Sequence, residues 1–250
     1  MKIRVRKISI FMASALFSVF FMYMMSSSVN ALNSFSSDLD ATSDQYFSRI
    51  NPAGLPMGSS PRTTEAWIKT TSSAEQAIID FGTDAGLYHA WEFVVAEDSI
   101  GVRLNGGNTF WTANDITDGN WHHVALVYSG EGTVDANTIA YMDGVALTQS
   151  SFVTAIPDTT DHWIYIGGAG TPVAAFFDGQ IDDVRIWRVA RSATEVANNI
   201  FGKLKKKDTG LVGHWKFDGG LLVDETSNHN DLTNNNNAQF STDVPPRKKK

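Results

Sequence analysis

Short runs of β-branched and aromatic residues recur along this chain, and stretches rich in Gly, Asn and Asp separate them. Residues of these types favour extended strands, and many short strands divided by turn signals are typical of an all-β sandwich or barrel. Asp143-Gly144 supplies one tight hairpin signal. We expect strands at residues 45–49, 63–70, 76–81, 91–96, 99–104, 109–112, 121–128, 138–142, 163–167 and 177–187.

One helix is expected after the last of these strands. Ser192 and Glu195 have the spacing of a capping box, in which the hydroxyl and the carboxylate satisfy N–H groups of the first turn. The helix should be short, ending near Ile200 or Phe201, with Gly202 as the stop.

The first 31 residues have the pattern of an export signal. Four basic residues precede an apolar run from Ile8 to Met25, and Val29-Asn30-Ala31 offers small residues for cleavage. We therefore expect a secreted protein, extracellular or at the cell surface, with the periplasm as an alternative and no membrane span after cleavage. The apolar run is close to the length that crosses a bilayer, so a retained anchor is the other reading.

The chain has no cysteine, so it has no disulfide framework, and its core must hold the fold. Residues 32–202 contain 7 basic and 21 acidic residues, a net charge of −14. An acidic body repels phosphate backbones, which argues against nucleic acid as a partner, whereas it suits calcium. Half of the basic residues after position 31 lie in runs near the C-terminus, which we interpret as a solvated linker and tail.

Four phrases in a fixed order carry a family resemblance. They are Thr-Thr-Glu-Ala-Trp-Ile-Lys at 63–69, Trp-His-His-Val-Ala-Leu-Val-Tyr at 121–128, Ile-Ala-Tyr-Met-Asp-Gly-Val at 139–145 and Gly-Gln-Ile-Asp-Asp-Val-Arg-Ile-Trp at 179–187. Over residues 38–201 the chain resembles the laminin-G-like branch of the concanavalin A-like jelly-roll family. The resemblance implies a two-sheet antiparallel jelly-roll sandwich with a short helix near 192–201. It also implies binding of glycans or extracellular protein, since few such relatives are enzymes. Animal relatives often carry disulfides, so the lack of cysteine favours a bacterial source.

Catalytic patterns of the family are missing. Relatives that cleave polysaccharides carry Glu-x-Asp-x-x-Glu on one strand face, and lyase relatives carry Gln-x-His and Tyr-x-Lys strands; none of these occurs. Adjacent strand residues face opposite ways, so neither Asp182-Asp183 nor His122-His123 forms a joint site. Glu65 stands alone on its strand, and we expect it to form a structural ion pair with Arg185. The sequence therefore predicts a protein that is not an enzyme.

A structural calcium ion is implied by the resemblance. Asp44 matches the Asp of the family's early Asp-Tyr phrase, and Asp183 matches the acidic residue before Val-Arg-Ile. Gln45 and Ala41 depart from that phrase and remove one carboxylate and one flexible position. The alternative is that these are ordinary turn aspartates that cap backbone N–H groups.

Aromatic residues near polar loops are the expected ligand-binding groups, because aromatic faces stack on the apolar faces of sugar rings. Trp67, Trp121 and Trp187 lie in the family phrases and are expected to be structural. The candidate binding residues are Trp91, Trp111, Trp163, Tyr88 and His89, with Asn105, Asn108 and Asn114 beside them.

The C-terminal segment leaves two alternatives. Residues 210–218 and 223–232 resemble the opening of another module of the same family, but too little chain follows to bury a second core. The segment is either the stub of a tandem protein or a strand that folds back on the preceding domain. The expected layout is a signal at 1–31, a jelly roll at 32–202, a linker at 203–209, a strand segment at 210–243 and a basic tail at 244–250.

The leading function is an exported, non-catalytic module that recognises a glycan or an extracellular protein. Two alternatives remain: a structural or adhesive (cell-adhesion) spacer in a tandem surface protein, and an outlying polysaccharide-cleaving enzyme. Exposed aromatics gathered in one cleft would favour glycan recognition over a spacer.

Overall fold

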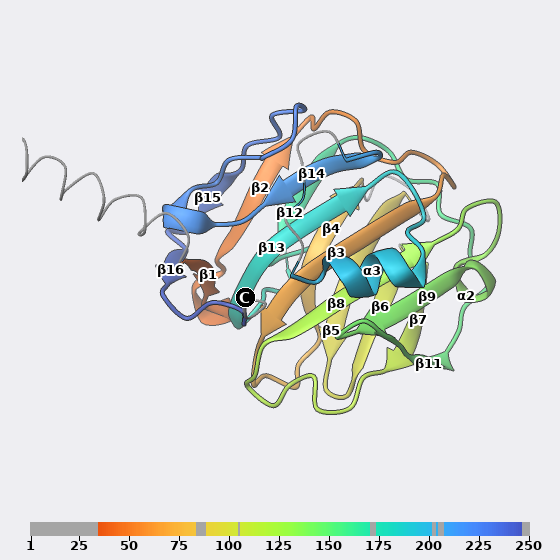
Figure 1. Ribbon diagram of the computed structural model, residues 1–250, viewed down its shortest axis with the longest axis horizontal. Coiled ribbons are helices and arrows are strands. Elements are labelled where there is room, and N and C mark those ends of the chain that lie inside the picture. Colours follow the sequence, from red (N-terminus) through yellow and green to blue (C-terminus); the bar gives the residue numbers. More distant parts are fainter. Residues whose placement is uncertain are drawn as a thin grey trace, which may run out of the picture.

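The computed structural model describes residues 35–83, 89–104, 106–170, 174–201, 204 and 208–246 (Figure 1). The predicted export signal, Tyr88, Asn105, most of the linker and the last four residues of the tail lie outside the described residues. Within the described part, the chain forms two antiparallel sheets of eight strands each, and the predicted jelly-roll sandwich is confirmed.

The first sheet, called sheet A, has the order β10-β9-β8-β3-β13-β1-β16, and β14 also pairs with β13. Its strands are β1 Ser36–Leu39, β3 Arg62–Lys69, β8 His122–Tyr128, β9 Thr138–Met142, β10 Val145–Ala146, β13 Gly179–Trp187, β14 Leu211–Trp215 and β16 Gln239–Ser241.

The second sheet, called sheet B, has the order β11-β7-β6-β5-β4-β12-β2-β15. Its strands are β2 Tyr46–Ile50, β4 Gln76–Gly82, β5 Ala90–Ala96, β6 Ser99–Leu104, β7 Gly107–Thr112, β11 Thr148–Ser151, β12 Trp163–Ile166 and β15 Thr233–Asn235.

All ten predicted strand ranges contain a strand, with ends shifted by no more than two residues. The predicted helix is α3, Ala193–Asn199, and both halves of its capping box between Ser192 and Glu195 are present. The structure adds a four-residue helix, α2 (Val134–Asn137), and two 3-10 turns, η1 (Ala41–Ser43) and η2 (Asp218–Gly220). None of these three was expected.

The core lies between the sheets, because alternate residues of each strand point inward. Ala66 and Ile68 on β3 belong to it, as do Val184 and Ile186 on β13, and all four are fully buried. The outward faces of β3 and β13 carry polar and aromatic side chains instead.

A β-bulge interrupts β13. Asp182 is opposite Trp67 and Arg185 is opposite Glu65, so two residues of β13 face one residue of β3. Asp183 has a φ of 49°, the left-handed conformation that such an extra residue often takes. On the edge of β13 that faces away from β3, two strands pair on either side of the bulge. β1 pairs with residues 179–181, and β14 pairs with the stretch from Val184 to Trp187.

The C-terminal segment lies on the sandwich, beside the N-terminal strands (Figure 1). β14 pairs with β13, β15 with β2, and β16 with β1. Trp215 is fully buried, and its Nε1 donates to the carbonyl oxygen of Asn230 at 2.9 Å. Of the two arrangements considered from sequence, the structure has the one in which the segment folds back.

A buried carboxylate holds the turn after β14. Asp224 accepts hydrogen bonds from the backbone N–H groups of His214, Thr226 and Asn230 at 2.9–3.0 Å. Asn230 in turn bonds both the N–H and the carbonyl oxygen of Ala53, in the loop after β2. The C-terminal segment is thus tied to the start of the domain by side chains as well as by strands.

Candidate functional site

A polar row crosses the outer face of sheet B. The strand register places five residues opposite one another on adjacent strands: Tyr165, Asp80, Glu92, Arg103 and Asn108. Their sequence neighbours Phe81, Phe93 and Val102 are in the core. Because adjacent strand residues point to opposite faces, the row itself lies on the outside of the sandwich.

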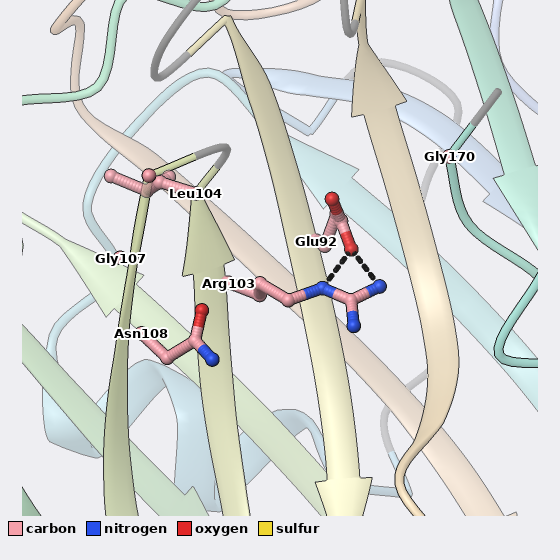
Figure 2. Close-up of a pocket in the computed structure, with 7 residues that line it drawn as sticks. Glu92, Arg103, Leu104, Gly107, Asn108 and Gly170 are labelled. Carbon is pink, nitrogen blue, oxygen red and sulfur yellow. Dashed lines mark hydrogen bonds and ion pairs between the residues drawn. The ribbon is translucent and has the colours of Figure 1, made fainter.

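An open pocket of about 410 Å³ lies at the Arg103 end of this row (Figure 2). Its lining residues come from β5, from β6 and β7 with their connecting turn, and from the loop after β12. They are Glu92, Arg103, Leu104, Gly106, Gly107, Asn108 and Gly170. Its size falls in the range of small-molecule sites, and its polar groups converge from different strands.

The guanidinium of Arg103 is held by two carboxylates. Its Nε and Nη2 both contact Glu92 Oε2 at 2.5 Å, and its Nη1 contacts Glu75 Oε1 at 2.6 Å. Burial lowers the pKa of Arg103, but the charges of Glu92, Glu75 and Asp80 outweigh it and raise that pKa above its usual value. The side chain of Arg103 is 28% exposed, so it remains accessible from the pocket.

An apolar strip lies next to the polar row. Val94, Gly101 and Phe110 are opposite one another on β5, β6 and β7. A Cβ atom at Gly101 would come within 2.5 Å of the Phe110 ring, so the glycine lets this ring lie across the sheet. Phe110 packs on a small cluster formed by Ala77, Val94 and Ala169. The face therefore offers a flat aromatic surface beside hydrogen-bonding groups.

An exposed aromatic lies at the edge of sheet B. Phe152 follows β11, which pairs with β7, and it is 71% exposed. On either side of it in the chain, Val153 lies over Gly107, and Ser151 Oγ accepts a hydrogen bond from the Phe110 N–H at 3.3 Å. An exposed ring of this kind can stack on a sugar.

The three tryptophans expected to bind ligand do not present their rings to solvent. Trp91 and Trp111 belong to the hydrophobic core, so the expectation of exposed rings is wrong for both. The ring of Trp91 instead packs on the buried guanidinium of Arg62, whose Cζ lies 5.1 Å from the ring centre. Phe81 and Tyr128 contact the same guanidinium, so three aromatic rings surround it. Burial among these rings lowers the pKa of Arg62 to about 9.

Trp163 lies on the polar row's side of sheet B, but it is buried too. Its Nε1 donates to Asp80 Oδ2 at 3.2 Å, and its ring stacks on Tyr165 at 5.4 Å. His89 is half-buried, 3.3 Å from Asp158, and does not line the pocket. Tyr88 lies outside the described residues. Of the polar residues named beside the tryptophans, Asn108 does line the pocket.

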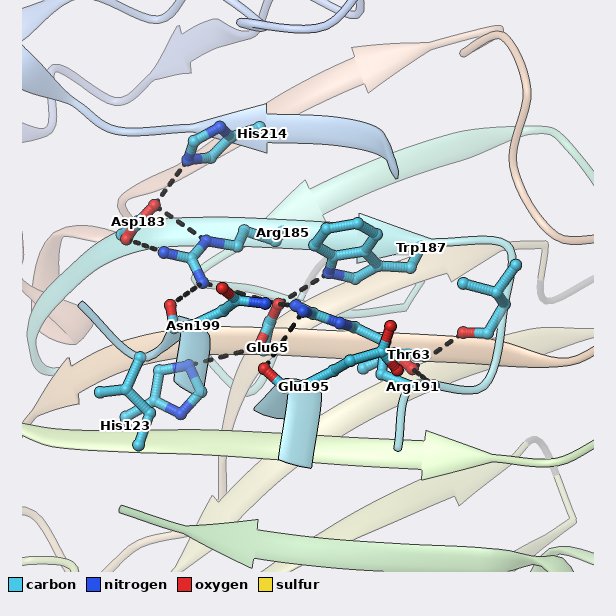
Figure 3. A network of polar contacts seen from close by, with 12 residues as sticks. Thr63, Glu65, His123, Asp183, Arg185, Trp187, Arg191, Glu195, Asn199 and His214 are labelled. Carbon is cyan, nitrogen blue, oxygen red and sulfur yellow. Dashed lines mark hydrogen bonds and ion pairs between the residues drawn. The ribbon is translucent and has the colours of Figure 1, made fainter. Parts of the chain in front are cut away.

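A second polar cluster lies on the outer face of sheet A, and α3 covers it (Figure 3). Glu65 is its centre: it accepts hydrogen bonds from Trp187 Nε1 at 2.7 Å and from Arg191 Nη1 at 2.8 Å. Arg185 Nη1 lies 3.6 Å from Glu65, so the predicted ion pair is confirmed. We call these four residues, together with His123, the sealed network.

The sealed network joins α3 to the sheet. Arg185 Nη1 donates to the carbonyl oxygen of Asn199 at 3.0 Å, and Arg191 Nη2 donates to that of Glu195 at 3.2 Å. Burial alone would raise the pKa of Glu65, but Arg185, His123 and Arg191 lower it to about 2. Glu65 and His123 are buried and 3.4 Å apart, yet no substrate can reach them. The network is therefore structural.

The residues named for calcium do not meet. Asp183 accepts hydrogen bonds from Arg185, through both carboxylate oxygens, and from His214 at 2.6 Å, and these partners hold its pKa well below the usual range although burial opposes them. Asp44 lies beyond Leu39, which pairs with Gly179, whereas Asp183 is four residues further along β13. That separation is about 13 Å along a strand. By this register the two residues lie toward opposite ends of the β1–β13 pair.

Other expected features can be placed as well. No group of three or more His, Asp or Glu side chains in the described part of the chain is arranged to hold a metal. Calcium binding stays a prediction, and melting curves recorded with and without calcium test it. No helix among the described residues is long and apolar enough to cross a membrane.

Together these features define a class: an all-β sandwich with one face sealed by a helix and the other open at a pocket. A family model described as the concanavalin A-like lectin/glucanases superfamily matches residues 41–197. The chain belongs to this superfamily, in its laminin-G-like branch. A search of curated proteins gave no significant match.

Two solved structures share the fold, and a third is similar only over part of its length. A Bacteroides ovatus protein, provisionally assigned as carbohydrate-binding, is 21% identical with a TM-score of 0.61; the alignment covers 86% of this chain and 62% of that protein. This chain thus spans less than two thirds of the length of that relative. A heptameric SAP-like pentraxin from Limulus polyphemus is 15% identical with a TM-score of 0.59, covering 84% and 95% of the two chains. Domains LG4-5 of mouse laminin α1 are 16% identical with a TM-score of 0.39, covering 56% and 40%.

Proposed function

We propose that this chain is an exported, non-catalytic recognition module that binds a glycan on the outer face of sheet B. The observation that carries the proposal is the pocket at the polar row. The half-buried ring of Phe110 lies on the neighbouring strip of the same face, and the exposed ring of Phe152 follows β11 at the sheet edge. Asn108 and Glu75 supply hydrogen-bonding groups for sugar hydroxyls, and Phe110 and Phe152 supply faces for stacking. A superfamily rich in lectins supports this reading.

The geometry of the carboxylates supports a non-catalytic role. Glu92 and Glu75 are both engaged in ion pairs with Arg103, whereas glycoside hydrolysis needs one carboxyl that is free to act as a general acid. In the other cluster, Glu65 is inaccessible beneath α3. We expect no reducing ends to be released from any glycan that the protein binds.

The test is a glycan array followed by titration calorimetry on the glycans retained. We expect Asn108→Ala and Phe152→Ala each to weaken binding by about tenfold or more, since each loses a contact worth roughly 1–2 kcal/mol. Phe201→Ala is the matched control, because Phe201 is also an exposed aromatic but lies beside Trp67 on the opposite face. Unchanged binding in both pocket variants would move the site elsewhere, and a blank array would end the proposal.

Export and location are tested separately. The basic residues, apolar run and small residues of the first 31 positions support cleavage after Ala31. N-terminal sequencing of protein recovered outside the cell should begin at Leu32. An intact Met1 in the membrane fraction would instead favour an anchor.

A further inference from the structure

The pocket contains an arginine, but its local charge is negative. Among the described residues that line it, Arg103 is the one cation. Three carboxylates act on that guanidinium, those of Glu92, Glu75 and Asp80. The local balance is therefore negative, although a basic side chain stands in the middle of the site.

The nitrogens of Arg103 are already engaged. Nε and Nη2 are on Glu92 Oε2, and Nη1 is on Glu75 Oε1 (Figure 2 shows the Glu92 pair). A carboxylate or sulfate on a ligand would need the same donors, because bidentate pairing with arginine is how proteins usually hold such groups. The ligand would have to displace Glu75 or Glu92 and leave that carboxylate uncompensated beside a second anion. Displacing the largely buried Glu92 would cost the most.

The net charge of the rest of the domain also disfavours acidic ligands. Residues 32–202 carry a net charge of −14, so an acidic glycan is repelled before it arrives. Neutral rings meet no such cost, because their hydroxyls can donate to carboxylate oxygens at the rim, where Glu75 is partly exposed. An ammonium group on an amino sugar would be attracted.

We propose that this pocket selects neutral or amino sugars and rejects glycans that carry carboxylate or sulfate groups. The inference rests on the proposed function and refines it, by assigning the ligand's charge class to the Glu92–Arg103–Glu75 arrangement. Arg103 here orients the two glutamates and fills the floor of the site, and it does not bind an anion.

The experiment is an array that holds neutral, amino, carboxylated and sulfated glycans, including chitohexaose with its deacetylated hexamer and lactose with 3′-sialyllactose. We expect wild-type protein to bind neutral or amino members at least about tenfold more tightly than acidic partners of the same backbone. Glu75→Gln should narrow that ratio several-fold, because it removes one carboxylate and frees Arg103 Nη1. Glu131→Gln, an exposed carboxylate in the turn after β8, is the matched control and should leave the ratio unchanged.

The outcomes separate the two proposals. Retention of acidic glycans alone, or equal binding within the matched pairs, overturns the charge selection and leaves glycan recognition standing. A neutral preference that Glu75→Gln and Glu131→Gln alter equally also overturns it, because the preference would then come from overall charge. A blank array sinks the proposed function, and the charge selection with it.

Discussion

Each outer face of the sandwich carries a glutamate–arginine pair on neighbouring strands, but within the described part of the chain a helix packs over only one of the two pairs. Glu65 lies opposite Arg185 across two strands of sheet A, and Glu92 lies opposite Arg103 across two strands of sheet B. Helix α3 closes over the first pair, whose side chains are 0% and 1% exposed. The described residues place no helix over the second pair, whose side chains are 7% and 28% exposed.

Whether a helix packs over a cross-strand ion pair therefore decides whether the pair is structural or available to a ligand. On sheet A the pair is sealed, and Arg185 and the neighbouring Arg191 each donate to a backbone carbonyl of α3, so the cluster fixes the helix in place. On sheet B the pair stays at the floor of a pocket, where a ligand can compete for its hydrogen bonds. Residue type alone does not distinguish the two sites; what packs on top of them does.

The largest effect should come from deleting residues 210–250. The deletion removes β14, which lies along β13 and places His214 on Asp183, and it strips buried Trp215 and Phe217 from the core. Loss of two large aromatic anchors costs several kcal/mol, and the bared edge of β13 favours aggregation. Light scattering and thermal melting check this. A truncated domain that stays monomeric and melts as the full chain does would show that both faces stand without the segment.

A matched pair of substitutions tests the comparison directly. Glu65→Gln leaves Arg185 and Arg191 buried without a carboxylate between them, and we expect a loss of about 3–5 kcal/mol in the free energy of unfolding. Glu92→Gln should cost less, about 1–2 kcal/mol, because Arg103 is 28% exposed and keeps Glu75 as a second partner. Urea titrations of both variants provide the measurement, and equal losses would mean that the helix cover is energetically irrelevant.

Acid should act mainly on the sealed side. The pKa of Glu65 is lowered to about 2 in the folded protein, so its contribution to stability is present above the unfolded value of 4.5. That contribution is lost as pH falls through the window from about 4.5 to 2. We expect melting temperatures of wild-type protein to drop across this window and those of Glu65→Gln to drop less. Parallel curves for the two proteins would contradict the assignment.

The smallest effect should come from a surface pair on sheet A that nothing covers. A hydrogen bond from His122 Nδ1 to the carboxylate of Asp143, 2.9 Å away, raises the pKa of His122 although burial opposes it. A raised folded pKa stabilises fully below the unfolded value of 6.5, and the gain is lost as pH rises through the folded pKa. Asp143→Asn should shift the His122 titration downward in NMR and change stability by less than about 1 kcal/mol. An unshifted titration would assign the effect to Asp118 instead.

What the sequence predicts well here is local. The strand ranges and the α3 capping box follow from residue preferences within a few positions, and the structure has all of them. Strands β1, β15 and β16 were not predicted, because each is three or four residues long and pairs with a segment that is distant in the sequence. Their existence depends on tertiary pairing, which local propensity does not contain.

The site residues were harder to predict for a physical reason. A tryptophan beside a polar loop can equally be core, and only alternation separates the two cases: Trp91 shares its face with Phe93 and Val95, while Glu92 points away. That signal was present in the sequence, but Trp91 was nevertheless assigned to the binding site, and alternation would have identified it as a core residue. By contrast, the pairing of Glu92 with Arg103 depends on the hairpin register, and the position of Phe152 depends on how β11 joins β7.

The hydrogen bond from Ser36 Oγ to the carbonyl oxygen of Asp243 joins residues 207 positions apart. The first strand of the domain therefore gains its last partner only when residues up to Asp243 are available to fold. Closing such a distance is slow relative to hairpin formation, because the entropy of the intervening chain opposes it. Until then β1, β2 and β13 each keep an unpaired edge, and the nascent domain is open to chaperones and to proteases. Folding thus includes an interval in which most strands can pair but the outer edge of β1 is still open.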